Sequence, residues 1–201
     1  MLSKKIEDVK FICLDTETTG LDPKNGGRIC EIAMVGSRGG QREGFYTSLL
    51  NPECHIPPDV TAIHGITDEM TAKAPKFSSV ALNIIDFLQG NVIVGHNAAF
   101  DICFIRKEFE LSGLRMPEVV VLDTLKFART HCRFPNNRLG TVAEQLGISS
   151  EGWHRALADT VMTEKIFYYF IDKFKKMGAQ TLCDLVTLQT RKVIEFNKQE
   201  N

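Results

Sequence analysis

Long hydrophobic runs and an excess of either charge are missing from this sequence. The longest uninterrupted apolar run, 166–171, has six residues and includes two tyrosines, whereas a membrane-spanning helix needs about 20. The first ten residues carry charge but lack the apolar core of a signal peptide, so we expect a cytoplasmic protein with no membrane partner. Lys and Arg number 24, Asp and Glu 25, and the net charge is −1. This balance excludes a histone-like bulk attraction to nucleic acid but leaves room for a local basic groove.

Paired cysteine motifs are also missing. The six cysteines form no C-x-x-C pair, so neither a zinc site nor a thioredoxin-like motif is indicated. Without a secretion signal, disulfides are not expected. Cys13, Cys30 and Cys103 lie in apolar stretches, and we interpret them as small buried side chains.

What the sequence contains is one domain's worth of ordinary globular chain. Of its 201 residues, 43% are apolar and 24% charged, enough to bury a sizeable core. Apolar runs and turn residues predict strands at 11–14, 28–35, 44–50, 92–94 and 119–122, with a glycine-rich turn at 36–40. Helical spacing predicts helices at 77–88, 98–111, 124–129, 138–146 and 156–174. This order indicates an α/β layout with a mixed sheet.

The last segment, 175–201, is more polar and is expected to be a final helix or a loose tail. We place the domain at 1–174. The apolar residues at 182, 185, 186 and 188 could belong to an amphipathic helix packed on that domain, or could dock a larger partner.

Two acidic residues directly follow the first predicted strand. Asp15 and Glu17 are two positions apart, so on an extended chain both side chains point to the same face. Two adjacent carboxylates repel each other unless a cation lies between them. The alternative is a solvated turn, because the segment 15–21 also has good turn chemistry.

Two further acidic residues are placed at helix starts. Asn97 can cap the helix that follows it, which puts Asp101 in the first turn, where the helix dipole favours a carboxylate. Asp159 follows His154 by five residues, which is not a one-face helical spacing, so His154 is expected on the loop that enters the helix. There it could exchange protons near carboxylates. The alternatives are a dipole-compensating aspartate and a surface histidine beside Trp153.

In combination, these motifs resemble the DEDDh family of 3′→5′ exonucleases. The resemblance covers about residues 9–172 and is carried by the segments 14–21, 96–101 and 154–159, with further likeness at 28–33, 63–67 and 121–125. Three motifs in register are far more specific than a lone short pattern. Within the family, the likeness is greatest to the proofreading epsilon branch of bacterial DNA polymerase III.

The resemblance implies a ribonuclease H-like exonuclease fold, a mixed five-stranded sheet flanked by helices. It also implies that four carboxylates hold two divalent ions, Mg²⁺ or Mn²⁺, and that His154 is the general base; the four are Asp15, Glu17, Asp101 and Asp159. The expected activity is release of nucleoside 5′-monophosphates from single-stranded DNA 3′ ends by a two-metal mechanism, with a DNA polymerase catalytic subunit as a possible partner. The alternatives are an RNA-trimming exonuclease such as RNase T or oligoribonuclease, and an inactive binding module.

The resemblance also assigns substrate contacts. Thr18 and Glu17 would meet the terminal 3′-hydroxyl, and Leu21 and Ile66 would bracket the last base. The residues expected to line the terminal-nucleotide pocket are His64, Asn97 and Phe100. For Leu21, Ile66 and Phe100 the alternative is core packing. A modest basic surplus at 102–140 suggests strand contacts, for which we prefer Arg133 and Arg138; a solvated helix face would look the same.

Overall fold

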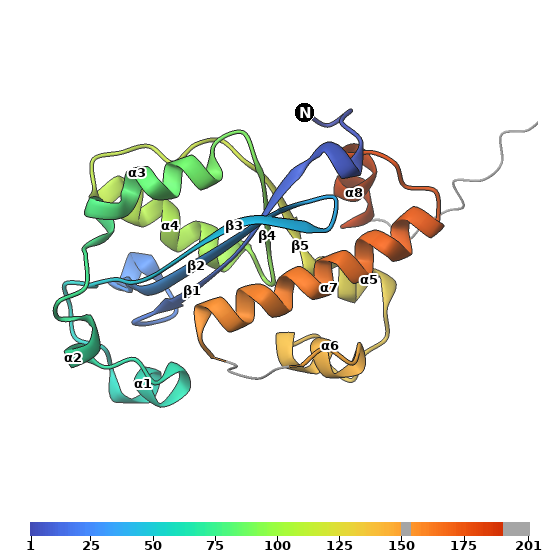
Figure 1. Ribbon diagram of the computed structural model, residues 1–201. Coiled ribbons are helices and arrows are strands. Elements are labelled where there is room, and N and C mark those ends of the chain that lie inside the picture. The colour runs from blue at the N-terminus through green and yellow to red at the C-terminus, as the bar shows by residue number, and fades with distance from the viewer. Residues whose placement is uncertain (150–153, 191–201) are drawn as a thin grey trace, which may run out of the picture.

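One mixed sheet forms the centre of the molecule (Figure 1). The structure is a computed structural model that describes residues 1–149 and 154–190. Its strands are β1 (Lys10–Thr18), β2 (Ile29–Arg38), β3 (Gln41–Leu49), β4 (Val92–Gly95) and β5 (Val120–Asp123). They lie in the order β3-β2-β1-β4-β5. β2 pairs antiparallel with β1 and β3, whereas β4 is parallel to β1 and β5. The predicted mixed five-stranded sheet is confirmed.

Helices flank this sheet. They are α1 (Pro58–His64), α2 (Asp68–Thr71), α3 (Phe77–Leu88), α4 (Ala99–Leu111), α5 (Thr124–His131), α6 (Leu139–Gln145), α7 (Ala156–Lys176) and α8 (Leu182–Leu188), with short 3₁₀ turns η1 (Ile6–Asp8) and η2 (Pro23–Asn25). The five predicted helices are present within a few residues of their expected bounds. α1 and α2 were not predicted, because helices of seven and four residues are too short to show a 3.6-residue period.

The two faces of the sheet are covered by different helices. Figure 1 shows α3 and α4 on one side and α7 on the other. Along β1, Phe11 and Cys13 pack in the cluster that includes α7, whereas Ile12 and Leu14 pack in the cluster of α3 and α4. This period of two is that of a strand buried on both faces. The odd-numbered positions of β1 therefore face α7.

Three details differ from the sequence expectation. β1 continues to Thr18, so the acidic positions lie within the strand instead of after it. β2 and β3 run through the predicted turn and reverse at Gly39 and Gly40, where φ values of 56° and 83° suit glycine. Cys103 is exposed, not buried, because α4 turns the next residue, Phe104, toward the sheet. Cys13 and Cys30 are buried as predicted.

The C-terminal helix packs on its own domain. Leu182, Leu185 and Leu188 of α8 are buried in the same cluster as α7. Backbone bonds join this end of the chain to the N-terminus, which lies beside α8 in Figure 1: Ile6 N–H donates to the Gln180 carbonyl at 3.0 Å. Residues 182–188 thus form a helix whose leucines pack on the domain, and partner docking by the segment 175–201 stays a prediction. None of the described helices combines the length and apolarity that crossing a membrane requires.

Candidate active site

Three carboxylates converge between β1 and α7. Asp15 and Glu17 follow Phe11 and Cys13 in the series of β1 residues that faces α7, and Asp159 lies in the first turn of that helix. One oxygen from each of the three lies within 4.8 Å of the others. The Oδ1 atom of Asp159 is buried and, among the described residues, accepts no hydrogen bond. Acceptor oxygens gathered in this way are the donor set that hard divalent cations prefer.

Asp101 approaches the same strand from the opposite side. It lies in the first turn of α4, as predicted, and its Oδ1 accepts hydrogen bonds from the backbone N–H and the hydroxyl of Thr16, at 3.0 and 2.7 Å. Because Thr16 lies between Asp15 and Glu17 in the strand, this contact places the Asp101 carboxylate next to these two acidic residues. The negative charge of Asp101 raises the pKa of Asp15, second only to burial.

Asn97 does not cap α4, contrary to prediction. Ala98 occupies the N-cap position, and Asn97 adopts a left-handed conformation with φ 72°, which asparagine tolerates better than most residues. Its backbone N–H donates to Asp123 Oδ1 at 3.0 Å. The same oxygen accepts from the Leu125 N–H at 2.9 Å, so Asp123 caps α5 and also holds the turn that leads to Asp101.

The surroundings of the acidic group raise the pKa of each of its carboxyl groups. Burial, followed by neighbouring carboxylates, raises the pKa of Glu17 to about 8 and that of Asp15 well above its ordinary value. Burial raises the pKa of Asp101 and of Asp159 to about 7. Carboxyl groups that resist ionisation together favour a positive ion in their midst. The residues therefore fit a divalent metal.

His154 stands at the entrance to α7 with an exposed side chain. Its φ of 66° is left-handed, a costly conformation for a non-glycine residue. The Asp159 carboxylate accepts a hydrogen bond from the His154 backbone, which lowers the pKa of Asp159 against the effect of burial. The expectation that His154 precedes the helix is confirmed. Trp153, its predicted neighbour, lies outside the described residues.

An ion pair between a buried glutamate and an exposed arginine adjoins His154. Glu31 of β2 lies opposite Glu17 in the strand pairing and is 4% exposed. Its carboxylate accepts from Arg155 Nη2 at 2.6 Å, from Arg155 Nε at 3.1 Å and from the Ala156 N–H at 3.0 Å. We call this arrangement the Glu31–Arg155 clamp.

The sequence reasoning missed the clamp, although a signal was present. Glu31 is flanked by Ile29, Cys30 and Ile32 in a strand that reads as buried. A lone charge in such a strand requires a partner. An arginine directly after the candidate base was a reasonable candidate for that partner.

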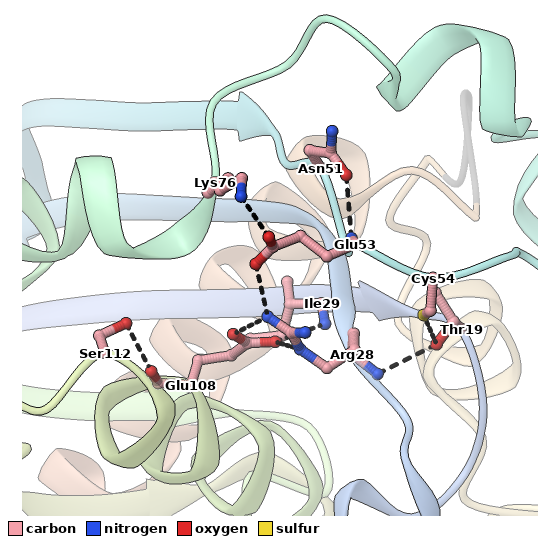
Figure 2. Close-up of polar contacts among 9 residues, drawn as sticks. All are labelled: Thr19, Arg28, Ile29, Asn51, Glu53, Cys54, Lys76, Glu108 and Ser112. Carbon is pink, nitrogen blue, oxygen red and sulfur yellow. Dashed lines mark hydrogen bonds and ion pairs between the residues drawn. The ribbon is translucent and has the colours of Figure 1, made fainter.

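A second polar network holds the loop that carries Leu21, whose side chain is 89% exposed. Thr19 and Arg28 close the base of this loop through Thr19 N–H to Arg28 O at 2.9 Å and Arg28 N–H to Thr19 Oγ1 at 3.0 Å. Figure 2 shows the Arg28 guanidinium between Glu108 of α4 and Glu53, which in turn contacts Lys76. Because Leu21 is 89% exposed, the core-packing alternative for this residue is wrong.

The other predicted pocket residues are more enclosed. His64 is 4% exposed; its Nδ1 accepts from the Ile66 N–H at 3.0 Å, and burial lowers its pKa. Ile66 is fully buried with Cys30 and Ile56, and Phe100 is partly buried 4.9 Å from the Phe104 ring. Packing accounts for both side chains, and their contact with a base stays a prediction.

Of the remaining predicted residues, Thr18 donates its hydroxyl to the Gly20 carbonyl at 2.7 Å, and Asn97 is exposed. The basic candidates Arg133 and Arg138 are exposed. The loop between them is tied to the turn before α4, since His96 Nε2 lies 2.8 Å from the Asn137 carbonyl oxygen.

Comparison with known proteins agrees with this geometry. The exonuclease family model RNase_T matches residues 12–167. The chain belongs to this family, in its DEDDh branch, and has the ribonuclease H-like fold that its motifs predicted.

Three similar proteins illustrate the range of the family. The 3′-5′ exonuclease DinG of Bacillus subtilis is 32% identical over 177 residues, 88% of this chain but 19% of DinG. The DNA polymerase III subunit epsilon of Treponema pallidum is 32% identical over 94% of this chain and 89% of its own length. The structure of exonuclease X in complex with 5′ overhanging duplex DNA matches with a TM-score of 0.69 and 26% identity, covering 90% of this chain and 99% of that one. This chain thus spans about a fifth of DinG but most of the other two.

Proposed function

We propose that this protein is a metal-dependent 3′→5′ exonuclease that releases nucleoside 5′-monophosphates from single-stranded DNA 3′ ends, in the manner of an epsilon proofreading subunit. The observation that carries the proposal is the group of three carboxylate oxygens within 4.8 Å, with one buried Asp159 oxygen left without a described partner. The DNA in the exonuclease X structure and the epsilon relative support DNA as the substrate.

Each residue of the site has a role in this proposal. Asp15, Glu17 and Asp159 would hold Mg²⁺ or Mn²⁺, and Asp101, beside Asp15, would complete the set for a second ion. Two divalent ions supply a more acidic attacking water and charge stabilisation at the leaving 3′-oxygen. His154, with its exposed imidazole, would accept the proton of that water.

Strand and nucleotide contacts complete the proposal. Leu21 would abut the last base, with Thr18 and Asn97 near the terminal nucleotide. Ile66, His64 and Phe100 would shape the pocket from behind. Arg133 and Arg138, exposed on either side of a loop tied to the site through His96, would contact strand phosphates.

The test is digestion of end-labelled single-stranded DNA and RNA of matched sequence, with Mg²⁺, Mn²⁺ or EDTA. We expect a metal-dependent 3′→5′ ladder that is stronger on DNA. A stronger ladder on RNA would assign the protein to RNA trimming, and no ladder on either would favour an inactive binding module. Asp15→Ala should lower turnover by about three powers of ten or more, as loss of a metal-activated nucleophile would. The exposed Asp86→Ala on α3 is the matched control.

A DNA polymerase catalytic subunit is the proposed partner, supported by the epsilon relative, and 175–201 is the proposed docking segment. Because Leu182, Leu185 and Leu188 already pack in the core, the contact would use other residues of this segment. Sedimentation with the purified polymerase subunit from the same source tests this: a single faster species supports the partner, and two unchanged species contradict it.

A further inference from the structure

We propose that the Glu31–Arg155 clamp positions His154. In this role neither Glu31 nor Arg155 touches the substrate. This inference rests on the proposed function, in which His154 is the base. Glu31 is buried opposite Glu17, and its negative charge raises the pKa of Glu17, Asp15 and Asp159. A carboxylate in this place increases repulsion within the acidic site.

The contacts of Glu31 explain what offsets this repulsion. Both of its oxygens accept hydrogen bonds, from the Arg155 guanidinium and from the Ala156 N–H. The Glu31 carboxylate therefore binds the start of α7, whereas Asp159 keeps one oxygen without a described partner. A planar guanidinium bound at two points fixes orientation as well as distance. The clamp therefore ties β2 to the two residues that follow His154.

The backbone at His154 shows why such a tie is needed. A left-handed φ of 66° is unfavourable for a residue other than glycine and persists only where neighbouring contacts impose it. Contacts are made on the C-terminal side: the clamp holds Arg155 and Ala156, and the His154 backbone donates to Asp159. Without the clamp, the chain before α7 could relax toward ordinary φ values, and the imidazole would move away from the carboxylates.

The experiment is a double-mutant cycle on single-turnover degradation of end-labelled single-stranded DNA, followed long enough to measure the slowest variant. Arg155→Ala should lower the rate about 10- to 100-fold, as loss of a positioning contact does. In the His154→Ala background the same change should alter the rate by no more than about twofold, because there is no imidazole left to position. Arg155→Lys, which keeps charge but not the fork, should fall between wild type and Arg155→Ala.

A second measurement does not depend on the chemical step. Mn²⁺ binding to Arg155→Ala, followed by electron paramagnetic resonance, should be no more than about twofold weaker than in wild type, because removing a positive charge near Glu17 does not oppose the binding of a cation. Arg38→Ala is the matched control, since Arg38 pairs with Glu43 at 2.9 Å, and the side chains of Arg38 and Arg155 are equally exposed, at 48%. Its rate should equal that of wild type.

Each outcome decides a separate point. Equal losses from Arg155→Ala in both backgrounds, an Arg155→Ala rate equal to wild type, or a matching loss of Mn²⁺ affinity would overturn the positioning role. A His154→Ala variant as fast as wild type would instead remove His154 as the base, which is a failure of the proposed function.

Discussion

Two arginine–glutamate pairs with buried carboxylates, Arg28–Glu108 and Arg155–Glu31, have the same local design. In each, a carboxylate accepts from the Nε and Nη2 of an arginine and from the backbone N–H of the following residue. For Glu108 the three distances are 2.8, 3.0 and 3.2 Å, with Arg28 and Ile29 as donors. For Glu31 they are 3.1, 2.6 and 3.0 Å, with Arg155 and Ala156 as donors. Both carboxylates are under 5% exposed.

Their surroundings differ. The Arg28 side chain is 19% exposed and has a second acidic neighbour, Glu53, which itself contacts Lys76; charges of both signs alternate there. The Arg155 side chain is 48% exposed and adjoins the acidic site, where Glu31 adds to the repulsion among carboxylates. Equal geometry in such different surroundings need not make an equal contribution. We expect the Arg28 pair to contribute mainly to stability, and the Arg155 pair mainly to activity.

Removing each carboxylate charge gives the largest contrast. Glu108→Gln leaves Arg28 with Glu53, 3.8 Å away, as its remaining acidic neighbour and removes the charge from two close hydrogen bonds, so we expect a loss of about 2 kcal/mol in the free energy of unfolding. Glu31→Gln should change it by about 1 kcal/mol or less, because Arg155 can reach solvent and repulsion at the acidic site is relieved. Urea denaturation of the metal-free proteins measures both. Equal losses at the two positions would show that surroundings do not matter here.

The second prediction uses pH to separate the acidic site from the rest of the molecule. Glu17 has a pKa of about 8 in the folded protein against an ordinary value of 4.5, so the folded state binds its proton more tightly. Its stabilising effect is complete below 4.5 and is lost as the pH rises through 8. The free energy of unfolding of the metal-free protein should therefore fall across this range.

Variants and metal give this pH test its controls. Glu17→Gln should flatten the decline, whereas Glu43→Gln, on the exposed β2–β3 hairpin, should leave it unchanged. Added Mg²⁺ should stabilise the protein more at pH 8 than at pH 5, because ionised carboxylates bind it best. Stability that rises with pH in the absence of metal would contradict the assigned shifts.

The features of the fold and site that the sequence predicted are those that depend on local patterns. The continuous apolar run of β1 and the helical spacing in α3, α4 and α7 are local patterns, so the sheet and these helices were predicted within a few residues. Asp15, Glu17, Asp101 and Asp159 were singled out because their motifs have fixed local settings. These four residues meet at β1 because of the sheet and helix arrangement, which the order of the motifs along the chain had already indicated.

What the sequence could not give depends on contacts between distant segments. Arg28 meets Glu108 across 80 positions, and Arg155 meets Glu31 across 124; no short-range pattern encodes such pairs. The capping role expected of Asn97 was wrong because Asp123, 26 positions away, draws its backbone N–H into a left-handed turn. In each case a tertiary hydrogen bond prevailed over local propensity.

The smallest predicted effect is also the most specific test of the comparison. Arg28→Lys and Arg155→Lys both keep the charge but lose the two-point contact, because an ammonium cannot form the guanidinium fork. At position 28 we expect a loss of about 1 kcal/mol in the free energy of unfolding, with an unchanged turnover rate per folded molecule. At position 155 we expect about 0.5 kcal/mol or less, but slower turnover at an unchanged KM. Thermal denaturation and steady-state digestion of the same preparations provide both numbers. If turnover fell in Arg28→Lys and stayed unchanged in Arg155→Lys, the roles assigned to the two pairs would have to be exchanged. The charges around each pair would then not explain why the same geometry contributes to stability in one place and to activity in the other.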